Sequence, residues 1–471
     1  MDSNNQQSSL HIVFFPFMSK GHMIPLLHLA RLLFLRRVSV TFFTTPANSP
    51  FIRQHLSNTD SSLVHVVELK FPENAPEIPP GVESTDRLPS MSLFVPFAKA
   101  TRLMQPDFEQ VLQSLPSVSC IISDGFLSWT QKSASKFGIP RAIFYGMNNF
   151  AASIFHAVIH NRFIANVKSD DEPFTFPDFP WLKFTKNDFT HPFDMAEPSG
   201  PHYEFIVEEG IAASQSQGIV VNSFCELETR FIEYWDREHE NTKAWCVGPL
   251  CLVEPPTAQP LQNQKPTWMQ WLDHKSAEGR SVLYVAFGTQ AEISQEQFQA
   301  IAEGLERSNV SFLWVIKSRE VKFLVDGYKE RVKDRGLVVS EWVNQREILE
   351  HQSVNGFISH CGWNSVLESI CASVPILAWP LMADQYLNAR LVVDEMGMGL
   401  RVVANNGSVR GFIESEMVEK MVKELMEGED GEKARKKMME ISKTAKSAID
   451  EGGSSWRTLD RFLDEVCKRT S

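Results

Sequence analysis

The stretch from Trp342 to Gln385 constrains the fold of this 471-residue chain more than any other. An apolar run from Val354 to Ser359 has the composition of a buried strand, and the polar residues 360–365 follow it as a tight turn. Residues 366–372 then have the pattern of a helix, and residues 375–379 that of a second strand. A strand, a turn, a helix and a strand in this order build a parallel sheet, and ligands collect at the carboxyl ends of such strands.

The turn before the predicted helix is a natural seat for a phosphate group. The N–H groups in the first turn of a helix lack partners, and the positive end of the helix dipole attracts anions. His360, as a cation or as a hydrogen-bonding group, and the polar Asn364 and Ser365 lie where they would add to this binding.

Each of these residues also has a structural interpretation. Ser365 and Glu368 match the S-x-x-E pattern of a capping box, which would only start the helix. His360 alone is compatible with a hydrogen-bonded structural histidine. Trp342 and Trp363 alone are compatible with packing residues of a core or its rim. The arrangement of these residues around two strand ends is what favours a binding site.

The whole stretch closely resembles the signature box of plant secondary-product glycosyltransferases that use UDP-sugars. The resemblance rests on its length, on the central sequence HCGWNS and on the closing Trp379–Pro380 and Asp384–Gln385. It implies that the first tryptophan stacks on uracil, that a glutamine and a glutamate bind ribose, and that the HCGWNS residues hold the diphosphate. The final Asp–Gln pair would bind the hydroxyls of the sugar. The residues that it assigns to the UDP-sugar are Trp342, Val343, Gln345, His360, Trp363, Asn364, Ser365, Glu368, Asp384 and Gln385.

The chain departs from the family pattern at three loop positions. Asn344 stands where the family more often has proline or serine. Asn355 and Ser373 stand where it more often has glycine. None of them removes a side chain that the resemblance assigns to the nucleotide, so they bear on loop geometry. Outside the stretch, Gly288 and Thr289 end a predicted strand before a helix, where they would meet the diphosphate or form a plain turn.

Length and composition predict two domains and exclude several kinds of partner. With 471 residues, 43% of them apolar, the chain is long enough for two cores. The net charge of −12 and the lack of a long basic run argue against nucleic acid and anionic membranes as partners. No apolar run reaches the roughly 20 residues of a membrane span. The seven cysteines lack C-x-x-C spacing, which indicates reduced thiols and a cytoplasmic protein. We also expect the protein to be a monomer.

The first part of the chain has the pattern of a parallel sheet. Residues 11–18 and 38–44 are predicted strands that flank a predicted helix at 23–35, and Ser19–His22 is a polar turn between them. A further strand, 119–123, ends at Asp124. His22 and Asp124 therefore both lie at carboxyl ends of strands in one predicted sheet.

The remaining strands and helices are predicted from the spacing of apolar residues in the same way. Further strands are predicted at 64–71, 142–145, 218–222, 281–287, 312–316, 337–340 and 400–403, and helices at 93–115, 129–137, 150–163, 204–214, 295–307 and 456–467. Prolines within 93–115 indicate a bend or two pieces. Residues 174–193 combine prolines with aromatic residues and are typical of a packed loop, with the wall of a lipophilic pocket as the alternative.

A Pro- and Gln-rich stretch separates the two expected domains. We assign residues 1–250 to an N-terminal acceptor-binding domain, 251–266 to a linker, 267–453 to a UDP-sugar-binding domain and 454–471 to a C-terminal helix. The resemblance implies an α/β protein with two Rossmann-like domains facing each other across a cleft, the GT-B arrangement, and a last helix that returns to the first domain.

Sugar transfer to a hydroxyl requires a base, a holder for the departing diphosphate and exclusion of water. His22 is the candidate base, and Asp124 is the candidate partner that fixes its tautomer. From pattern alone, a surface histidine and a helix N-cap aspartate are the alternatives; the resemblance favours the catalytic roles. No metal-binding cluster is visible, so we expect neither a metal nor another cofactor beyond the co-substrate UDP-glucose.

The acceptor is weakly encoded. Aromatic residues that are candidates for an apolar acceptor wall, or equally for core, are Phe15, Phe17, Phe126, Tyr145, Phe150, Phe155 and Phe179. Where the family often has Ser or Thr touching the donor sugar, this chain has Gly146–Met147–Asn148. The prediction is an inverting enzyme that moves glucose to a small lipophilic, phenolic or flavonoid-like acceptor. An inactive nucleotide-sugar-binding regulator and a sugar-nucleotide epimerase or hydrolase are the alternatives.

Overall fold

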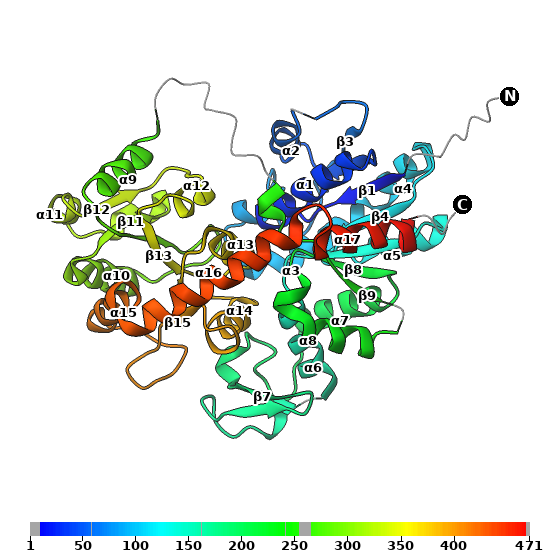
Figure 1. Ribbon diagram of the computed structural model, residues 1–471. Helices are drawn as coiled ribbons and strands as arrows, with labels where there is room; N and C mark the ends of the chain where they lie inside the picture. The colour runs from blue at the N-terminus through cyan, green and yellow to red at the C-terminus, as the bar shows by residue number, and fades with distance from the viewer. Residues whose placement is uncertain (1–9, 58, 162, 241, 254–264, 468–471) are drawn as a thin grey trace. The chain divides into compact units, whose positions relative to one another are not determined.

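The computed structural model describes residues 10–57, 59–161, 163–240, 242–253 and 265–467 (Figure 1). The chain divides into two compact units. The first unit comprises residues 1–149, 199–254 and 447–471, and the second comprises 150–198 and 255–446. Each unit is organised around its own parallel sheet, which confirms the α/β class with two Rossmann-like sheets.

The first unit holds a seven-stranded parallel sheet in the order β3-β2-β1-β4-β5-β8-β9. Its strands are β1 (His11–Phe15), β2 (Ser39–Thr44), β3 (Val64–Glu68), β4 (Cys120–Asp124), β5 (Arg141–Tyr145), β8 (Gly218–Val221) and β9 (Lys243–Cys246). Its helices are α1 (Lys20–Leu35), α2 (Ser49–His55), α3 (Phe94–Ala100), α4 (Gln105–Ser114), α5 (Trp129–Phe137), α7 (Pro201–Ser214), α8 (Cys225–Glu238) and α17 (Ser454–Phe462). The strand order reverses between β1 and β4, the place where ligands bind in open α/β sheets.

The second unit holds a six-stranded parallel sheet in the order β12-β11-β10-β13-β14-β15, which reverses between β10 and β13. Its strands are β10 (Val282–Ala286), β11 (Ser311–Val315), β12 (Gly336–Val339), β13 (Val354–Ser359), β14 (Ile376–Ala378) and β15 (Gly399–Arg401). Its helices are α9 (Thr267–Ala277), α10 (Gln295–Ser308), α11 (Tyr328–Val332), α12 (Gln345–Leu349), α13 (Trp363–Ala372), α14 (Gln385–Arg390) and α15 (Ser415–Glu427). The long α16 (Glu429–Ile449) ends in the first unit.

The segment from Phe150 to Pro198 packs with the second unit, although its two neighbours in the chain belong to the first. It contains most of α6 (Asn149–Asn161) and a separate antiparallel pair of strands, β6 (Phe174–Phe176) and β7 (Phe179–Phe184). Short 3₁₀ and π-helical turns of the chain are Thr85–Arg87, Met91–Leu93, Thr101–Met104, Phe163–Asn166, Lys186–Asp188, Leu250–Val253, Ser318–Phe323, Leu391–Glu395 and Leu463–Cys467.

The central strands of both sheets, such as β1 and β10, are buried along their whole length because helices cover both faces. In β1, Ile12 and Phe14 contribute to one buried cluster, while Val13 and Phe15 contribute to the cluster on the opposite face. In the second unit, Leu283 belongs to a corresponding core. These buried sheets hold the strand ends, and therefore the turns that follow them, in fixed positions.

The C-terminal helix α17 lies on the first unit. Arg36, the residue that follows α1, donates to Asp460 (Nε to Oδ1, 2.6 Å), and its guanidinium lies 3.8 Å from the ring centroid of Trp456. Phe462 packs edge-on against Trp245. The predicted linker 251–266 falls largely on residues 254–264, which lie outside the described residues, as do the last four residues of the predicted C-terminal helix.

Two local predictions differ from the structure. Helix α1 begins at Lys20, because the N–H of Met23 already donates to the carbonyl of Ser19, so His22 lies in the first helical turn instead of a preceding turn. Residues 174–184 form a hairpin instead of an irregular loop, and its prolines are tolerated because a two-stranded sheet has only edge strands. The predicted helix at 93–115 is in two pieces, α3 and α4, joined by a 3₁₀ turn, as its prolines indicated.

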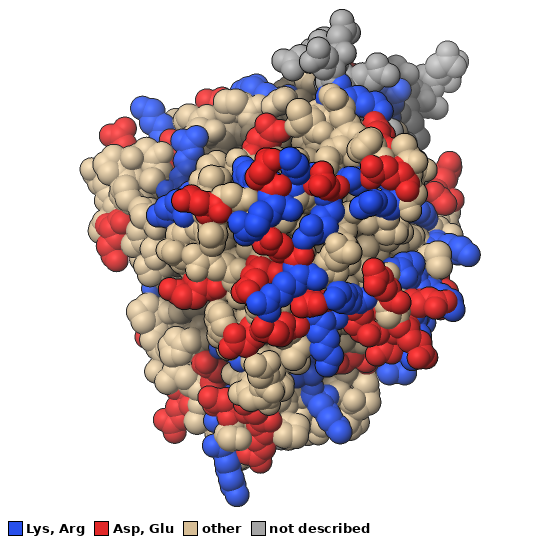
Figure 2. All heavy atoms as spheres, turned by 90° about the vertical axis from the view of Figure 1, so that its left-hand side faces the viewer, with Lys and Arg blue, Asp and Glu red and all other residues tan. Residues whose placement is uncertain are grey.

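The surface carries charges of both signs. On the face shown in Figure 2, acidic and basic side chains are interspersed. Exposed ion pairs such as Arg331–Glu306 (2.8 Å) and Lys423–Glu419 (2.6 Å) are part of this pattern. Among the described helices, none combines the length and the apolar composition that crossing a membrane requires. All seven cysteines are free thiols.

Candidate active site

His22 and Asp124 meet at the point where the strand order of the first sheet reverses. His22 lies in α1 just after β1, and Asp124 is the last residue of the neighbouring β4. Nδ1 of His22 lies 2.6 Å from Oδ2 of Asp124, although the two residues are 102 positions apart. The aspartate side chain is 1% exposed and the histidine 21% exposed, so the imidazole alone reaches toward solvent.

The carboxylate of Asp124 is held from both sides. Its second oxygen, Oδ1, accepts the backbone N–H of Phe126 at 3.0 Å. The nearby helix α5 begins after Ser128, so Asp124 is not an N-cap, and His22 is not an isolated surface histidine. The structure therefore favours the His–Asp pair over both structural alternatives.

Gly146, in the loop after β5, lies directly against the imidazole. A Cβ atom at this position would be 2.9 Å from Cε1 of His22, which is closer than real Cβ contacts. This chain therefore needs glycine at position 146, because a side chain would displace His22.

Aromatic rings surround the pair on the first unit. The rings of Phe17 and Phe126 lie 5.9 and 5.5 Å from that of His22, and Phe94 packs edge-on against Phe126. Of the candidates for an acceptor wall, those buried in cores are Phe15, Phe17, Phe150 and Phe179, and those half-buried are Phe126, Tyr145 and Phe155. The first group fits the core interpretation, and the second remains available for an acceptor.

A buried polar group that sequence reasoning missed lies behind the pair. Arg141 donates to the hydroxyl of Ser123 (2.7 Å) and to the carbonyl of Asp124 (3.3 Å), and burial lowers the pKa of Arg141 to about 10. Glu209 of α7 is 4% exposed, and neither of its carboxyl oxygens has a hydrogen-bond partner among the described residues. Burial raises the pKa of Glu209 to about 8, against the opposing effects of Ser128 and Arg141. Glu209 is therefore a neutral acid at pH 7.

His360 lies at the corresponding place in the second sheet, after β13 and beside the turn that follows β10. Cβ atoms at Gly288 and Gly362 would lie 2.8 and 2.5 Å from its Nε2, so both glycines permit the close approach of the ring. Burial lowers the pKa of His360 to about 4, and the nearby Lys317 lowers it further. At neutral pH His360 is thus a neutral hydrogen-bonding group in this structure, which favours that role over the cationic one.

The capping-box interpretation of Ser365 and Glu368 is wrong. Helix α13 begins at Trp363, its N-cap is Gly362, and no side chain caps it. Asn364 and Ser365 therefore lie inside the first turn, where the backbone N–H groups point toward an anion site. The helix starts earlier than predicted because Cys361 adopts a left-handed conformation (φ 62°), which turns the chain immediately after His360.

Ser365 and Glu368 instead share a partner on the neighbouring helix α12. Nε2 of Gln345 donates to Oγ of Ser365 (2.9 Å) and to Oε2 of Glu368 (2.7 Å). The hydroxyl of Tyr284 donates to Oε1 of Gln345 at 3.3 Å. The structure thus brings together the glutamine and glutamate that the resemblance assigns to ribose.

The two tryptophans have opposite environments. The side chain of Trp342 is 79% exposed, whereas that of Trp363 is 3% exposed. Trp342 is therefore suited to stack on a base, and the packing interpretation holds for the ring of Trp363, which leaves only its main chain for a ligand. Val343 is buried beside Trp342. Thr289 is exposed in a loop, and because α10 begins only at Gln295, Thr289 does not lie at a helix start as predicted.

Gln385 is held by backbone groups of the loop that precedes α14. Oε1 of Gln385 accepts the N–H groups of Leu381 and Met382, each at 3.0 Å. Its amide nitrogen is therefore the group that can donate to a sugar hydroxyl.

Asn388, which sequence reasoning missed, orients Asp384. Its Nδ2 donates to Oδ2 of Asp384 (2.8 Å) and to the carbonyl of Cys361 (2.9 Å). Asn388 thereby joins Asp384 to the turn that contains Cys361. The available signal was a polar residue four positions after Asp384 on one helix face.

Both units thus place polar groups where the strand order reverses, one around a carboxylate-oriented imidazole and the other around an anion-binding helix start. This is the plan of the GT-B glycosyltransferases, enzymes that transfer a sugar from a nucleotide. Among the described residues, no three His, Cys, Asp or Glu side chains are grouped so as to hold a metal ion.

Comparison with known proteins identifies the family. The sequence model described as "Glycosyltransferase, N-terminal domain" matches residues 8–252, and "UDP-glucoronosyl and UDP-glucosyl transferase" matches 257–447. UDP-glycosyltransferase 90A1 of Arabidopsis thaliana is 52% identical over 97% of this chain and 96% of its own length, and UDP-glycosyltransferase 90A2 is 51% identical over 97% and 98%. This chain belongs to the plant family 1 UDP-glycosyltransferases and is an enzyme of that class.

Solved structures agree in fold. UGT73P12 of Glycyrrhiza uralensis, complexed with glycyrrhetinic acid 3-O-monoglucuronide, is 30% identical with a TM-score of 0.86 over 98% of this chain and 96% of that one. UGT2 of Phytolacca americana, complexed with UDP-2-fluoro-glucose and pterostilbene, is 29% identical with a TM-score of 0.80 over 97% and 99%.

Proposed function

We propose that this enzyme transfers glucose from UDP-glucose to a hydroxyl group of a small lipophilic acceptor, with inversion to a β-glucoside. The observation that carries the proposal is the 2.6 Å contact between His22 and the buried carboxylate of Asp124, in an aromatic environment. An imidazole held in this way, with one ring nitrogen occupied by a carboxylate, is the arrangement of a general base.

In the proposed reaction, Nε2 of His22 removes the proton of the acceptor hydroxyl as the oxygen attacks the anomeric carbon. Asp124 keeps the proton of the neutral imidazole on Nδ1 and stabilises the imidazolium that forms. A single displacement of UDP inverts the configuration, so an α-linked donor gives a β-linked product. A positioned base of this kind contributes about 10²–10⁴-fold in rate.

We assign stabilisation of the departing diphosphate to the second unit. The N–H groups at the start of α13 and the neutral His360 are the donors that meet the developing negative charge. The proposal gives this role to these groups instead of Mg²⁺, because the described residues offer no cluster of metal ligands.

Glucose and a phenolic acceptor are supported by the relatives and by the site. One relative of solved structure binds UDP-2-fluoro-glucose together with pterostilbene, and another is described as glucosylating indoxyl. The half-buried ring of Phe126 beside His22 suits an apolar acceptor. On the donor side, the amide nitrogen of Gln385 and the carboxylate of Asp384 suit a sugar whose hydroxyls both donate and accept.

The decisive experiment is a panel of phenolic, flavonoid and alcohol acceptors with UDP-glucose, with products identified by mass spectrometry and the anomer by NMR. We expect UDP release that depends on the acceptor. Donor binding without turnover would instead support a regulator, and conversion of UDP-glucose without acceptor an epimerase or hydrolase. UDP-galactose and UDP-glucuronate serve as competing donors, and a clear preference for either would contradict the assignment of glucose.

Two variants test separately the role of the base and the binding of UDP. His22→Gln removes the base and should abolish transfer while UDP binding persists. Glu368→Ala removes one partner of Gln345 and should weaken UDP binding. A Glu368→Ala protein that binds UDP normally would refute the ribose assignment.

A further inference from the structure

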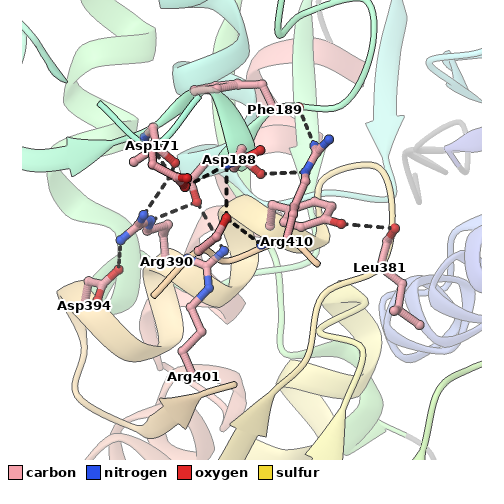
Figure 3. Close-up of polar contacts among 12 residues, drawn as sticks. Asp171, Asp188, Phe189, Leu381, Arg390, Asp394, Arg401 and Arg410 are labelled. Atoms are coloured by element: carbon pink, nitrogen blue, oxygen red, sulfur yellow. Dashed lines mark hydrogen bonds and ion pairs between the residues drawn. The ribbon is translucent and has the colours of Figure 1, made fainter. Parts of the chain in front are cut away.

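The segment around Asp188 is anchored in the second unit by a buried ion cluster (Figure 3). Asp188 ends the 3₁₀ turn after β7, and its side chain is fully buried. Its carboxylate accepts Nε and Nη2 of Arg390 at 2.9 and 2.8 Å and Nη2 of Arg401 at 3.1 Å. The backbone N–H of Thr185 donates to it at 2.8 Å. A carboxylate from the hairpin segment thus binds two arginines that follow it by about two hundred residues.

Both arginines depend on this carboxylate. Arg401 is 8% exposed, and its Nε and Nη1 have no partner among the described residues, so Asp188 is its one hydrogen-bonded partner there. Burial lowers the pKa of Arg401, and Asp188 opposes that effect. Arg390 has a second partner, Asp394, at 2.9 Å on the exposed side of the same helical region. Loss of Asp188 would therefore leave a buried guanidinium unpaired, which is strongly unfavourable.

A second contact runs from the same turn to the loop that precedes α14. The guanidinium of Arg410 donates to the carbonyls of Asn187 (2.9 Å) and Phe189 (2.5 Å) and lies 4.5 Å from the ring centroid of Tyr386. The hydroxyl of Tyr386 in turn donates to the carbonyl of Leu381 at 3.4 Å (Figure 3).

These two contacts hold both ends of the helix that carries the sugar-binding pair. Gln385 is the first residue of α14, Tyr386 the second and Arg390 the last. The π-helical turn Leu391–Glu395 directly continues this helix, and a helical segment this short is marginal on its own, so its contacts with neighbours fix its position. The orientation of the Gln385 amide, and of Asp384 through Asn388, is set by how this helix is seated.

We propose that Asp188 is a positioning residue for the donor sugar, which acts through Arg390 and Arg401 to hold α14 and thereby Asp384 and Gln385 in place. The inference rests on the proposed function, since it assigns the sugar of the donor to that pair. Asp188 touches neither substrate. It connects the hairpin segment of residues 150–198 to the part of the site that distinguishes one sugar from another.

The test compares Asp188→Asn with Asp394→Asn in the full-length enzyme. Both variants remove one negative charge from a partner of Arg390, but only the first releases Arg401 and the hairpin. The measured quantities are kcat/KM for UDP-glucose and for UDP-galactose, the inhibition constant of UDP and the melting temperature. Since small misplacements of reacting groups cost up to about 100-fold, we expect Asp188→Asn to lower kcat/KM for UDP-glucose by about 10–100-fold.

The diagnostic result is a change in sugar selection with nucleotide binding preserved. We expect the ratio of kcat/KM for the two donors to shift by about 10-fold while the inhibition constant of UDP stays within about 2-fold. Asp394→Asn should keep the wild-type ratio. Equal losses for UDP and for both donors, or an unchanged ratio, would show a merely structural role and overturn the proposal.

A second variant covers the case in which Asp188→Asn does not fold. Arg390→Lys keeps the charge but loses the paired hydrogen bonds to Asp188, and we expect the same change of donor ratio at smaller amplitude, about 3-fold. An Arg390→Lys enzyme with the wild-type ratio would overturn the proposal. A wild-type enzyme that transfers no sugar from either donor would instead refute the proposed function, so the two failures are distinguishable.

Discussion

Replacing Asp124 by asparagine tests the catalytic pair with almost no change of shape. The effect follows from the second hydrogen bond of this carboxylate, because the N–H of Phe126 donates to Oδ1 at 3.0 Å. In Asp124→Asn the amide oxygen must take that position to accept the same N–H. The amide NH₂ then faces Nδ1 of His22, which lies 2.6 Å from the present Oδ2. Nδ1 becomes an acceptor, the ring proton moves to Nε2, and Nε2 can no longer act as a base.

The size of the loss follows from two contributions. Turning the amide to restore the productive tautomer would leave the N–H of Phe126 unpaired, at a cost of about 1–3 kcal/mol, or about 5–150-fold in population. The variant also loses the charge that stabilises the imidazolium, which for unit charges about 4 Å apart is on the order of 4 kcal/mol near a protein surface. The two contributions overlap, and we expect kcat to fall by about 10²–10⁴-fold.

The assay is initial-rate transfer from saturating UDP-glucose across pH 5–9, with UDP binding and melting temperature measured in parallel. Both of the latter should match the wild type, because the substitution is nearly isosteric. Asp236→Asn is the matched control, since Asp236 also accepts a backbone N–H, from Ala244 at 2.9 Å, but lies in α8, outside the His22–Asp124 pair. An Asp124→Asn enzyme with more than about a tenth of the wild-type kcat would refute the tautomer argument.

Three further predictions concern backbone and buried charge. Gly146→Ala should lower kcat at least about 10-fold with little change in melting temperature, since the new Cβ would lie 2.9 Å from Cε1 of His22. The control is Gly210→Ala, because a Cβ at position 210 meets nothing within 4 Å. Ser373→Gly should raise the free energy of unfolding, measured in urea, by about 0.5–1 kcal/mol. The reason is that Ser373 caps α13 with φ 63°, a conformation that glycine takes without strain. An unchanged free energy of unfolding would contradict this prediction. The pKa of Glu209 is about 8 in the folded state against 4.5 in the unfolded state. Between these pH values the native state retains a proton that the unfolded state has released. The free energy of unfolding therefore falls as pH rises from 4.5 to 8. Glu209→Gln should therefore leave stability in urea nearly unchanged at pH 4.5 and raise it by several kcal/mol, up to about 5, at pH 8; a gain independent of pH would refute it.

The regular part of the fold could be predicted because it depends on local pattern. The strand Val354–Ser359 was predicted with its observed bounds, since six residues compatible with a buried strand precede polar ones. The bounds of α5 were also predicted. The amphipathic α8 was missed although its signal was present, with Leu227, Phe231 and Trp235 buried at helical spacing. The short edge strand β9 has no such signal.

The catalytic pair could be predicted by topology and the supporting contacts could not. His22 and Asp124 were inferred to meet because parallel strands bring their carboxyl ends to one edge of a sheet. No such rule relates Asp188 to Arg390 and Arg401, because their contact depends on where a long excursion of the chain packs. The left-handed Cys361, which advances the start of α13, also has no signal, since this conformation is usual only for glycine and asparagine.

The packing of residues 150–198 limits which substitutions can change acceptor specificity. The residues on either side of this segment belong to the first unit, whereas the segment packs with the second and carries Phe155, one of the half-buried candidates for the acceptor wall. Because Asp188 in the same segment binds Arg390 of α14, a substitution that reshapes the segment also disturbs the contacts that we propose to position Asp384 and Gln385. Changes of acceptor at Phe126, which lies in the first unit beside His22, carry no such penalty. Variation that preserves donor selectivity should therefore accumulate around Phe126 and away from the turn that contains Asp188.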